Sequence, residues 1–143
     1  MRSRELTATA VNRIRRSTGI IGMIALMALG AACGGNGEIT VEDVTGTWKV
    51  LTFGSAAQIN EDGTYSIAGT IERLEDSPLD AGQWTLEGAI FTYISSDESA
   101  VCTAGDRGIY EVELIDESRM SHIRQEDACD SRSAPTVNFE CVP

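Results

Sequence analysis

Four cysteines and one histidine are the residues whose chemistry depends most on spacing: Cys33, Cys102, Cys129, Cys141 and His122. Cysteines bind zinc or carry out redox exchange when they are held close together, usually as Cys-x-x-Cys, and otherwise form structural disulfides. The chain has no Cys-x-x-Cys and no second histidine to complete a zinc site. We therefore predict no metal site and no cofactor.

Catalytic residues are also not predicted. His122 lies in a strand-like run on the face shared by Met120 and Arg124, and we expect it at the surface or rim. A hydrolase needs a nucleophile, a base and an orienting group together, and no Gly-x-Ser-x-Gly is present. Glu111 and Glu113 are two residues apart on a strand, so both should face solvent. A non-enzymatic protein is expected.

The N-terminal segment determines which compartment the cysteines occupy. Residues 1–19 contain five arginines and one acid, and "IIGMIALMALGAA" then runs uncharged for 13 residues up to Cys33. A basic region, a short apolar region and small residues predict a secretory signal peptide over 1–32. The apolar run is shorter than the roughly 20 residues of a spanning helix, so a short membrane anchor or a buried helix is the weaker alternative.

The sequence "LGAAC" at 29–33 resembles the lipobox of bacterial lipoproteins. The resemblance implies that Ala31 and Ala32 fill the two small positions and that Cys33 is lipidated after cleavage, although Gly30 stands where an aliphatic residue is usual. It further implies a lipid anchor in a bacterial membrane, with the protein in the cell envelope on the extracytoplasmic side. Two or more acyl chains suffice for stable anchoring, and the Gly-rich start of 33–45 predicts a flexible tether.

The charge of the chain excludes one class of partner. Residues 33–143 contain 6 Lys and Arg against 21 Asp and Glu, a formal charge of −15. Such a surface repels phosphate backbones, so nucleic-acid binding is not expected. The surface also disfavours electrostatic attraction to anionic lipid, so membrane contact should come through the N-terminal lipid. The charge fits high solubility or salty surroundings, and the sharper alternative is a cationic protein partner.

Outside the cytosol, disulfides form and persist. Cys102 precedes a strand-like hairpin at 108–125 and Cys129 follows it, so antiparallel pairing would bring both cysteines to one end of the sheet. We therefore predict a Cys102–Cys129 disulfide, with Cys129–Cys141 as the alternative. With the first pairing, Cys141 would be free or joined to another molecule.

Short strands separated by turn residues account for most of the mature chain. In "GIYEVELI", apolar residues alternate with acidic residues that should face outward, which indicates an antiparallel sheet with one solvent-exposed face. Hairpin turns are expected at 60–63, 87–88 and 116–118, and one helical turn at 38–45 capped by Thr40. The pattern predicts an all-β domain, an up-and-down barrel or a sandwich, with eight strands at 47–53, 56–59, 64–71, 82–86, 89–95, 108–115, 119–125 and 136–142.

Several short motifs resemble those of lipocalins and related calycin barrels. The "GTW" at 46–48 is similar to their Gly-x-Trp start, and "EDGTY", "GQW", "GIYEVEL" and "DACDSR" are similar to turns of small lipocalin-like domains in bacterial lipoproteins. The resemblance implies that 46–143 is a lipocalin-like, closed eight-stranded antiparallel up-and-down barrel. It also implies that Trp48 packs at the closed end against Arg124 or Arg132.

Such a barrel either encloses a small molecule or is filled by its own side chains. The first hypothesis is a lipid-anchored protein whose barrel binds a small apolar or amphipathic ligand. The alternative is a structural or protein-interaction module of the envelope with a filled barrel. The residues expected to line the ligand or form the core are Trp48, Tyr65, Ile67, Trp84, Leu86, Tyr110, Val112 and Leu114.

Overall fold

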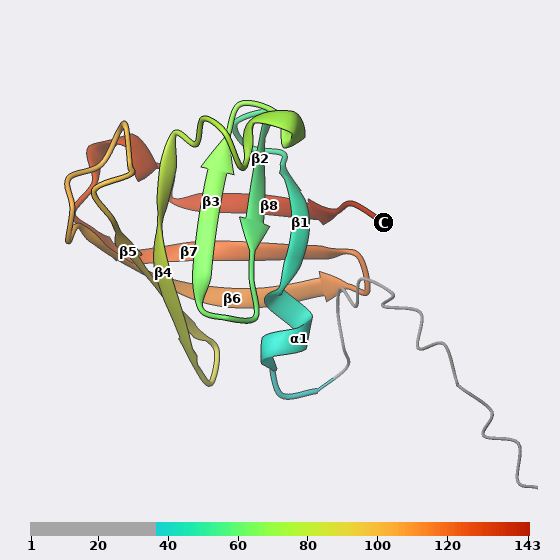
Figure 1. Ribbon diagram of the computed structural model, residues 1–143. Helices are drawn as coiled ribbons and strands as arrows, with labels where there is room; N and C mark the ends of the chain where they lie inside the picture. The colour runs from blue at the N-terminus through green and yellow to red at the C-terminus, as the bar shows by residue number, and fades with distance from the viewer. Residues whose placement is uncertain (1–36) are drawn as a thin grey trace, which may run out of the picture.

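A computed structural model of the chain describes residues 37–143. The predicted signal peptide at 1–32, the lipidation site Cys33 and the start of the predicted tether lie outside the described residues. Eight antiparallel strands follow one another around a closed barrel, which confirms the predicted fold class (Figure 1). The strands are β1 (Gly46–Val50), β2 (Ser55–Ile59), β3 (Thr64–Ala68), β4 (Asp80–Glu87), β5 (Ile90–Ser95), β6 (Arg107–Asp116), β7 (Arg119–Asp127) and β8 (Thr136–Cys141).

The two ends of the barrel differ in their connections. Tight turns join β2 to β3, β4 to β5 and β6 to β7 at one end, here called the turn end. At the β2–β3 turn, Gly63 has a φ of 85°, and Asp62 Oδ1 accepts hydrogen bonds from the backbone N–H and the hydroxyl of Thr64. A positive φ costs glycine little, so this turn forms where the sequence predicts it.

The opposite end, here called the loop end, carries the segments 51–54, 69–79, 96–106 and 128–135. Two of them contain short 3₁₀ helices, η1 (Ile71–Arg73) and η2 (Asp130–Arg132). The expected third strand stops at Ala68 rather than at residue 71, because the chain turns there into η1. The run 72–80 is polar, yet its last residue, Asp80, begins β4 and is buried.

The helix α1 (Val41–Val44) lies against the turn end, before the start of β1 (Figure 1). Its predicted cap is present, because Asp43 Oδ2 accepts hydrogen bonds from the backbone N–H and the hydroxyl of Thr40. Val44 is fully buried in the barrel core. The last residues of the segment predicted as a tether therefore pack on the barrel. Within 37–143, no helix is both long and apolar enough to cross a membrane.

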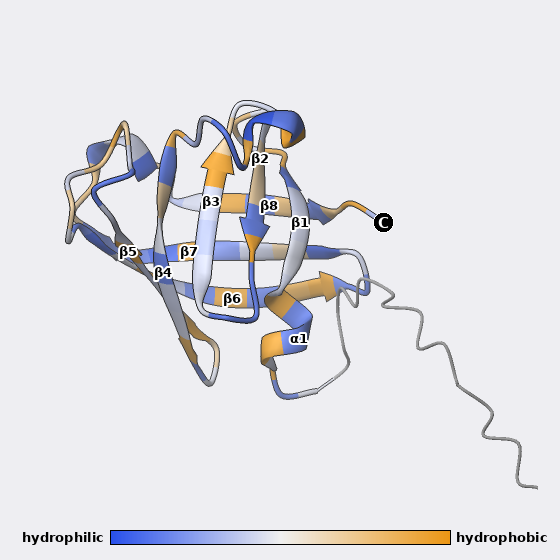
Figure 2. Cartoon of the chain, in the orientation of Figure 1, coloured by the Kyte–Doolittle hydropathy of each residue, from blue (hydrophilic) through white to orange (hydrophobic). Residues whose placement is uncertain are grey.

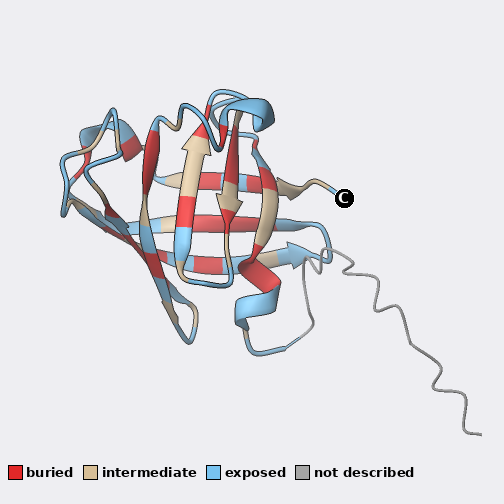
Figure 3. Ribbon diagram, viewed as in Figure 1, coloured by how far each residue is buried: buried red, intermediate tan, exposed pale blue. Residues whose placement is uncertain are grey.

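The core fills the barrel along its length. Hydrophobic and hydrophilic residues alternate along the strands (Figure 2), and buried residues alternate with exposed ones (Figure 3). This period-two pattern turns one set of side chains inward on every strand. The core cluster contains Trp48, Tyr65, Trp84, Tyr110 and Val112, and the partly buried side chains of Ile67, Leu86 and Leu114 pack against it. Five of the eight predicted interior residues therefore belong to the core cluster, and the other three lie against it.

Trp48 does not meet the arginine that the resemblance implied. Its Nε1 donates to the carbonyl of Val44 at 3.0 Å, and its ring lies edge-on to Phe139 with centroids 6.4 Å apart. Arg124 is exposed and donates to the carbonyl of Ser133. Arg132 is at the loop end over the ring of Tyr93. The expectation fails because buried carboxylates hold Arg132 elsewhere.

Candidate functional site

A cavity of about 300 Å³ opens at the loop end and reaches into the barrel. The exposed side chains of Phe53, Leu79 and Val101 line its outer part. Its inner walls are mainly apolar, and this volume is at the lower limit for small-molecule sites. The inner wall residues include Val50, Ile67, Tyr93, Tyr110, Val137 and Phe139.

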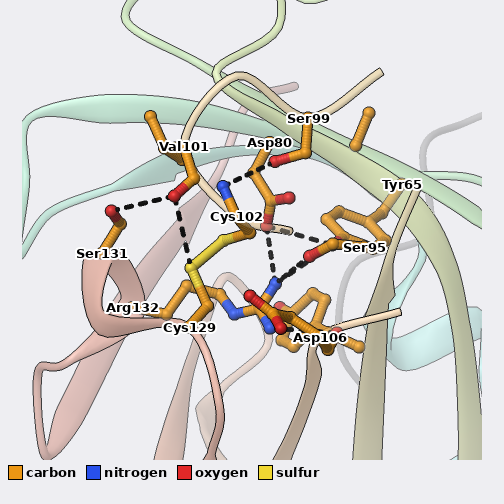
Figure 4. Close-up of polar contacts among 12 residues, drawn as sticks. Tyr65, Asp80, Ser95, Ser99, Val101, Cys102, Asp106, Cys129, Ser131 and Arg132 are labelled. Carbon is orange, nitrogen blue, oxygen red and sulfur yellow. Dashed lines mark hydrogen bonds and ion pairs between the residues drawn. A yellow bond between two sulfur atoms is a disulfide. The ribbon is translucent and has the colours of Figure 1, made fainter. Parts of the chain in front are cut away.

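A buried ionic cluster, defined as Asp80, Asp127 and Arg132, borders the cavity, and Asp80 and Arg132 line it. Arg132 Nη1 lies 2.7 Å from Asp80 Oδ2, and its Nε lies 2.8 Å from Asp127 Oδ2. The same Nη1 donates to Ser95 Oγ at 2.8 Å, as Figure 4 shows. Burial alone would lower the pKa of Arg132, but the hydrogen bonds to the two carboxylates raise it above its ordinary value. The guanidinium is therefore charged at every relevant pH.

Asp127 is inside the barrel because β7 contains a bulge. Ile109 pairs with Glu126 and Tyr110 pairs with Arg124, so Gln125 has no partner on β6. The extra residue changes which face of β7 points inward. Gly108 lies opposite Asp127, and a Cβ at this glycine would come 2.5 Å from Asp127 Oδ2. The carboxylate occupies space that any other residue at 108 would fill.

The two carboxylates of the cluster differ in how well they are satisfied. Asp127 accepts from Arg132, from the hydroxyl of Tyr110 and from the backbone N–H of Cys129. Asp80 Oδ2 accepts from Arg132 and, at 3.0 Å, from the hydroxyl of Tyr65. Asp80 Oδ1 is buried and has no hydrogen-bond partner among the described residues. Because an unpaired buried acceptor is costly, Asp80 is a binding candidate.

His122 lies at the inner end of the cavity, and the expectation of a surface or rim histidine is wrong. Its side chain is fully buried, and Nδ1 lies 3.0 Å from the hydroxyl of Tyr93. Nε2 has no hydrogen-bond partner among residues 37–143. Desolvation lowers the pKa of His122 to about 3, so the imidazole is neutral at physiological pH and has one polar atom to offer.

Burial also sets the protonation of the tyrosines at the site. It raises the pKa of Tyr93 well above its ordinary value, and the nearby Tyr110 and Tyr65 contribute to that rise. The pKa values of Tyr65 and Tyr110 are also raised, chiefly by burial. All three phenols therefore stay protonated, as hydrogen-bond donors with apolar rings. The three hydroxyls already contact Asp80, Asp127 and His122, so the site offers a ligand apolar walls, one incompletely paired carboxylate and one imidazole nitrogen.

The neutral state of His122 predicts an acid-sensitive stability. The unfolded chain binds a proton at His122 below a pKa of about 6.5, whereas the folded chain does so only near 3, so stability falls as the pH decreases between these values. Between pH 7 and pH 5, we expect the free energy of unfolding of His122→Phe to fall by about 2 kcal/mol less than that of the wild type. Urea denaturation at both pH values measures this difference. Parallel losses in the two proteins would contradict it.

The cysteine pair predicted from the sequence is the pair that the structure joins. Cys102 and Cys129 form a disulfide at the loop end, beside the ionic cluster (Figure 4). Ser131 Oγ donates to the carbonyl of Val101 at 3.2 Å, which ties the same two segments together. The alternative pairing of Cys129 with Cys141 is therefore wrong. The expectation that Cys141 would be a free thiol is also wrong, because Cys141 is not a free cysteine.

Of the predicted interior residues, Ile67 and Tyr110 line the cavity, whereas Trp48, Trp84, Leu86, Val112 and Leu114 form the rest of the core. Tyr65 reaches the ionic cluster through its hydroxyl. Sequence reasoning missed the polar part of the site. The shared face of His122 and Met120 carried a signal for an inward histidine, since Met120 is an apolar core residue. Sequence reasoning did not predict that Asp80, Ser95 and Asp127 surround Arg132 inside the barrel. It also did not predict that His122 is buried.

Comparisons of the chain with protein-family models, with curated proteins and with solved structures gave no match.

Proposed function

We propose that this protein is a lipid-anchored, lipocalin-like binding protein of the cell envelope whose barrel takes up a small apolar or amphipathic molecule. One observation carries the binding proposal. The cavity of about 300 Å³ has apolar walls, and two buried polar atoms without partners among the described residues belong to side chains that line it. Apolar walls with a few convergent polar groups are typical of small-molecule sites.

Native mass spectrometry of the protein purified from its host tests this proposal. We expect an additional mass that is lost when the protein is denatured. Ser131 lines the cavity at its exposed end, so Ser131→Trp should obstruct entry and reduce the bound fraction at least tenfold. The matched control is Ser133→Trp, because Ser133 is also exposed but does not line the cavity. Equal occupancy in the two variants, or no bound mass in the wild type, would contradict the proposal.

The anchoring proposal rests on the sequence "LGAAC" and the basic, apolar segment before it. The chain enters the barrel through α1 at the turn end, whereas the cavity opens at the loop end. An anchor at Cys33 would therefore join the barrel at the end opposite the cavity mouth. In that arrangement a ligand could enter from the aqueous side.

Replacing Cys33 should release the protein from the membrane. We expect Cys33→Ala to be recovered in the soluble fraction after cell lysis, while the control Gly34→Ala stays with the membrane, because only Cys33 can carry the thioether-linked lipid. Mass spectrometry of the N-terminal peptide should show acyl chains on Cys33. An N-terminal peptide without acyl chains on Cys33, or membrane retention of Cys33→Ala, would contradict the anchor.

A further inference from the structure

We infer that the ligand of the cavity is a small apolar molecule with a protonated amine and that Asp80 receives the amine. This inference rests on the proposed function and specifies its ligand class. It depends on the charge of the ionic cluster, on the hydrogen bonds that Arg132 already makes and on the free oxygen of Asp80.

The ionic cluster lacks one positive charge. Arg132 contributes one positive charge, and Asp80 and Asp127 contribute two negative charges. The three side chains are at most 9% exposed, so water screens their charges poorly. A ligand cation would bring the cluster to neutrality, whereas a ligand anion would add to its excess negative charge.

Arg132 has no donor left for a ligand anion. Its Nε and Nη2 donate to the two oxygens of Asp127 at 2.8 and 3.0 Å, and Nη2 also reaches the carbonyl of Asp106 at 3.5 Å. Its Nη1 is surrounded by acceptors on Asp80, Ser95 and Tyr65 at 2.7 to 3.2 Å. A guanidinium has five N–H donors, and these contacts occupy them. The arginine therefore holds the cluster together and does not recruit a carboxylate.

Asp80 supplies the acceptor for a cation. Its side chain lines the cavity and is 3% exposed, and Oδ1 has no hydrogen-bond partner among the described residues. Moving an ammonium group out of water is costly unless a charged hydrogen-bond partner receives it, and this oxygen is such a partner. The rings of Tyr93, Tyr110 and Phe139 also line the cavity and present π-systems that attract cations.

The cavity also limits the size of the molecule. A volume of 300 Å³ equals that of about ten liquid waters at roughly 30 Å³ each, so the site holds on the order of ten non-hydrogen atoms. One aromatic ring with a two-carbon amine chain has this size. His122 Nε2 offers a second polar contact, to a hydroxyl or similar group on the ligand.

Three probes with nearly the same apolar body separate the charge requirement from apolar binding. They are 2-phenylethylamine, 2-phenylethanol and 3-phenylpropionate, titrated at pH 7 by calorimetry into the full chain purified from its host and freed of bound molecules. We expect the amine to bind at least tenfold more tightly than the alcohol, and the carboxylate to bind most weakly. In Asp80→Asn, the advantage of the amine over the alcohol should disappear.

The control variant is Asp130→Asn, which removes the same charge at the loop end from an exposed residue that does not line the cavity. It should keep the preference for the amine. The preference among the probes in the wild type decides the inference even if Asp80→Asn fails to fold. Equal binding of the three probes, or preference for the carboxylate, would overturn the amine inference and leave the binding function intact. Failure of all three to bind, with no bound mass in native spectra, would overturn both.

Discussion

Arg132→Met is expected to destabilise the barrel by about 3–5 kcal/mol, because it leaves two buried carboxylates without their cation. Arg132 joins segments that are far apart in sequence, since it binds Asp80 on β4, Ser95 on β5 and Asp127 on β7. Its removal should therefore loosen the loop end as a whole. Urea denaturation followed by tryptophan fluorescence measures the loss.

The matched control is Arg124→Met. Arg124 is exposed, and its side chain donates a hydrogen bond to the carbonyl of Ser133 at the surface. Substitutions of this kind usually change stability by no more than about 0.5 kcal/mol. Similar losses in the two variants would show that the ionic cluster does not hold the loop end together.

The double variant Cys102→Ser with Cys129→Ser is expected to lose about 3–4 kcal/mol of unfolding free energy. The bond links residues 27 apart in sequence, and the chain-entropy estimate for such a loop gives this magnitude. The disulfide also holds the segment 96–106 beside η2, which carries Arg132. Denaturation in urea under non-reducing conditions gives the difference.

A matched double variant also introduces two serines into these segments but leaves the Cys102–Cys129 disulfide intact. Thr103→Ser with Ala128→Ser places serine at neighbouring exposed positions of the same two segments. This control should unfold within about 1 kcal/mol of the wild type, since exposed substitutions have small effects. If the cysteine variant were as stable as this control, the disulfide would not stabilise the folded barrel.

The barrel could be predicted because its signals are local. Alternation in runs such as 108–114 and turn residues such as Gly63 act over a few positions, and the eight expected strands are the eight that form. The Cys102–Cys129 disulfide could also be predicted from the sequence, because one hairpin places both cysteines at the same end of the sheet. Each of these predictions needed only neighbouring segments.

The ionic cluster could not be predicted in the same way, because it depends on contacts between strands. A bulge at Gln125 turns Asp127 inward, and simple alternation from His122 would place Glu126 there instead. Asp80 followed a polar run that indicates a loop, and its burial requires a guanidinium more than 50 residues away. Polar residues are ordinarily assigned to the surface, and these are buried because their partners come from other strands.

His122 is an intermediate case. Its spacing from Met120 placed it on an inward face, but its type suggested the rim. Burial is tolerated because the imidazole is neutral and contacts the hydroxyl of Tyr93 from a strand 29 residues earlier. The alternation of β7 was therefore a better guide to the position of His122 than its polarity.

A crystal structure of the protein purified from its host, without added ligands, tests the central claim most directly. We expect a small molecule in the cavity at the loop end, with a donor within hydrogen-bond distance of Asp80 Oδ1 and a polar contact to His122 Nε2. A cavity filled by the protein's own side chains, with Asp80 Oδ1 and His122 Nε2 bonded to protein groups, would contradict it and favour a structural or protein-interaction role.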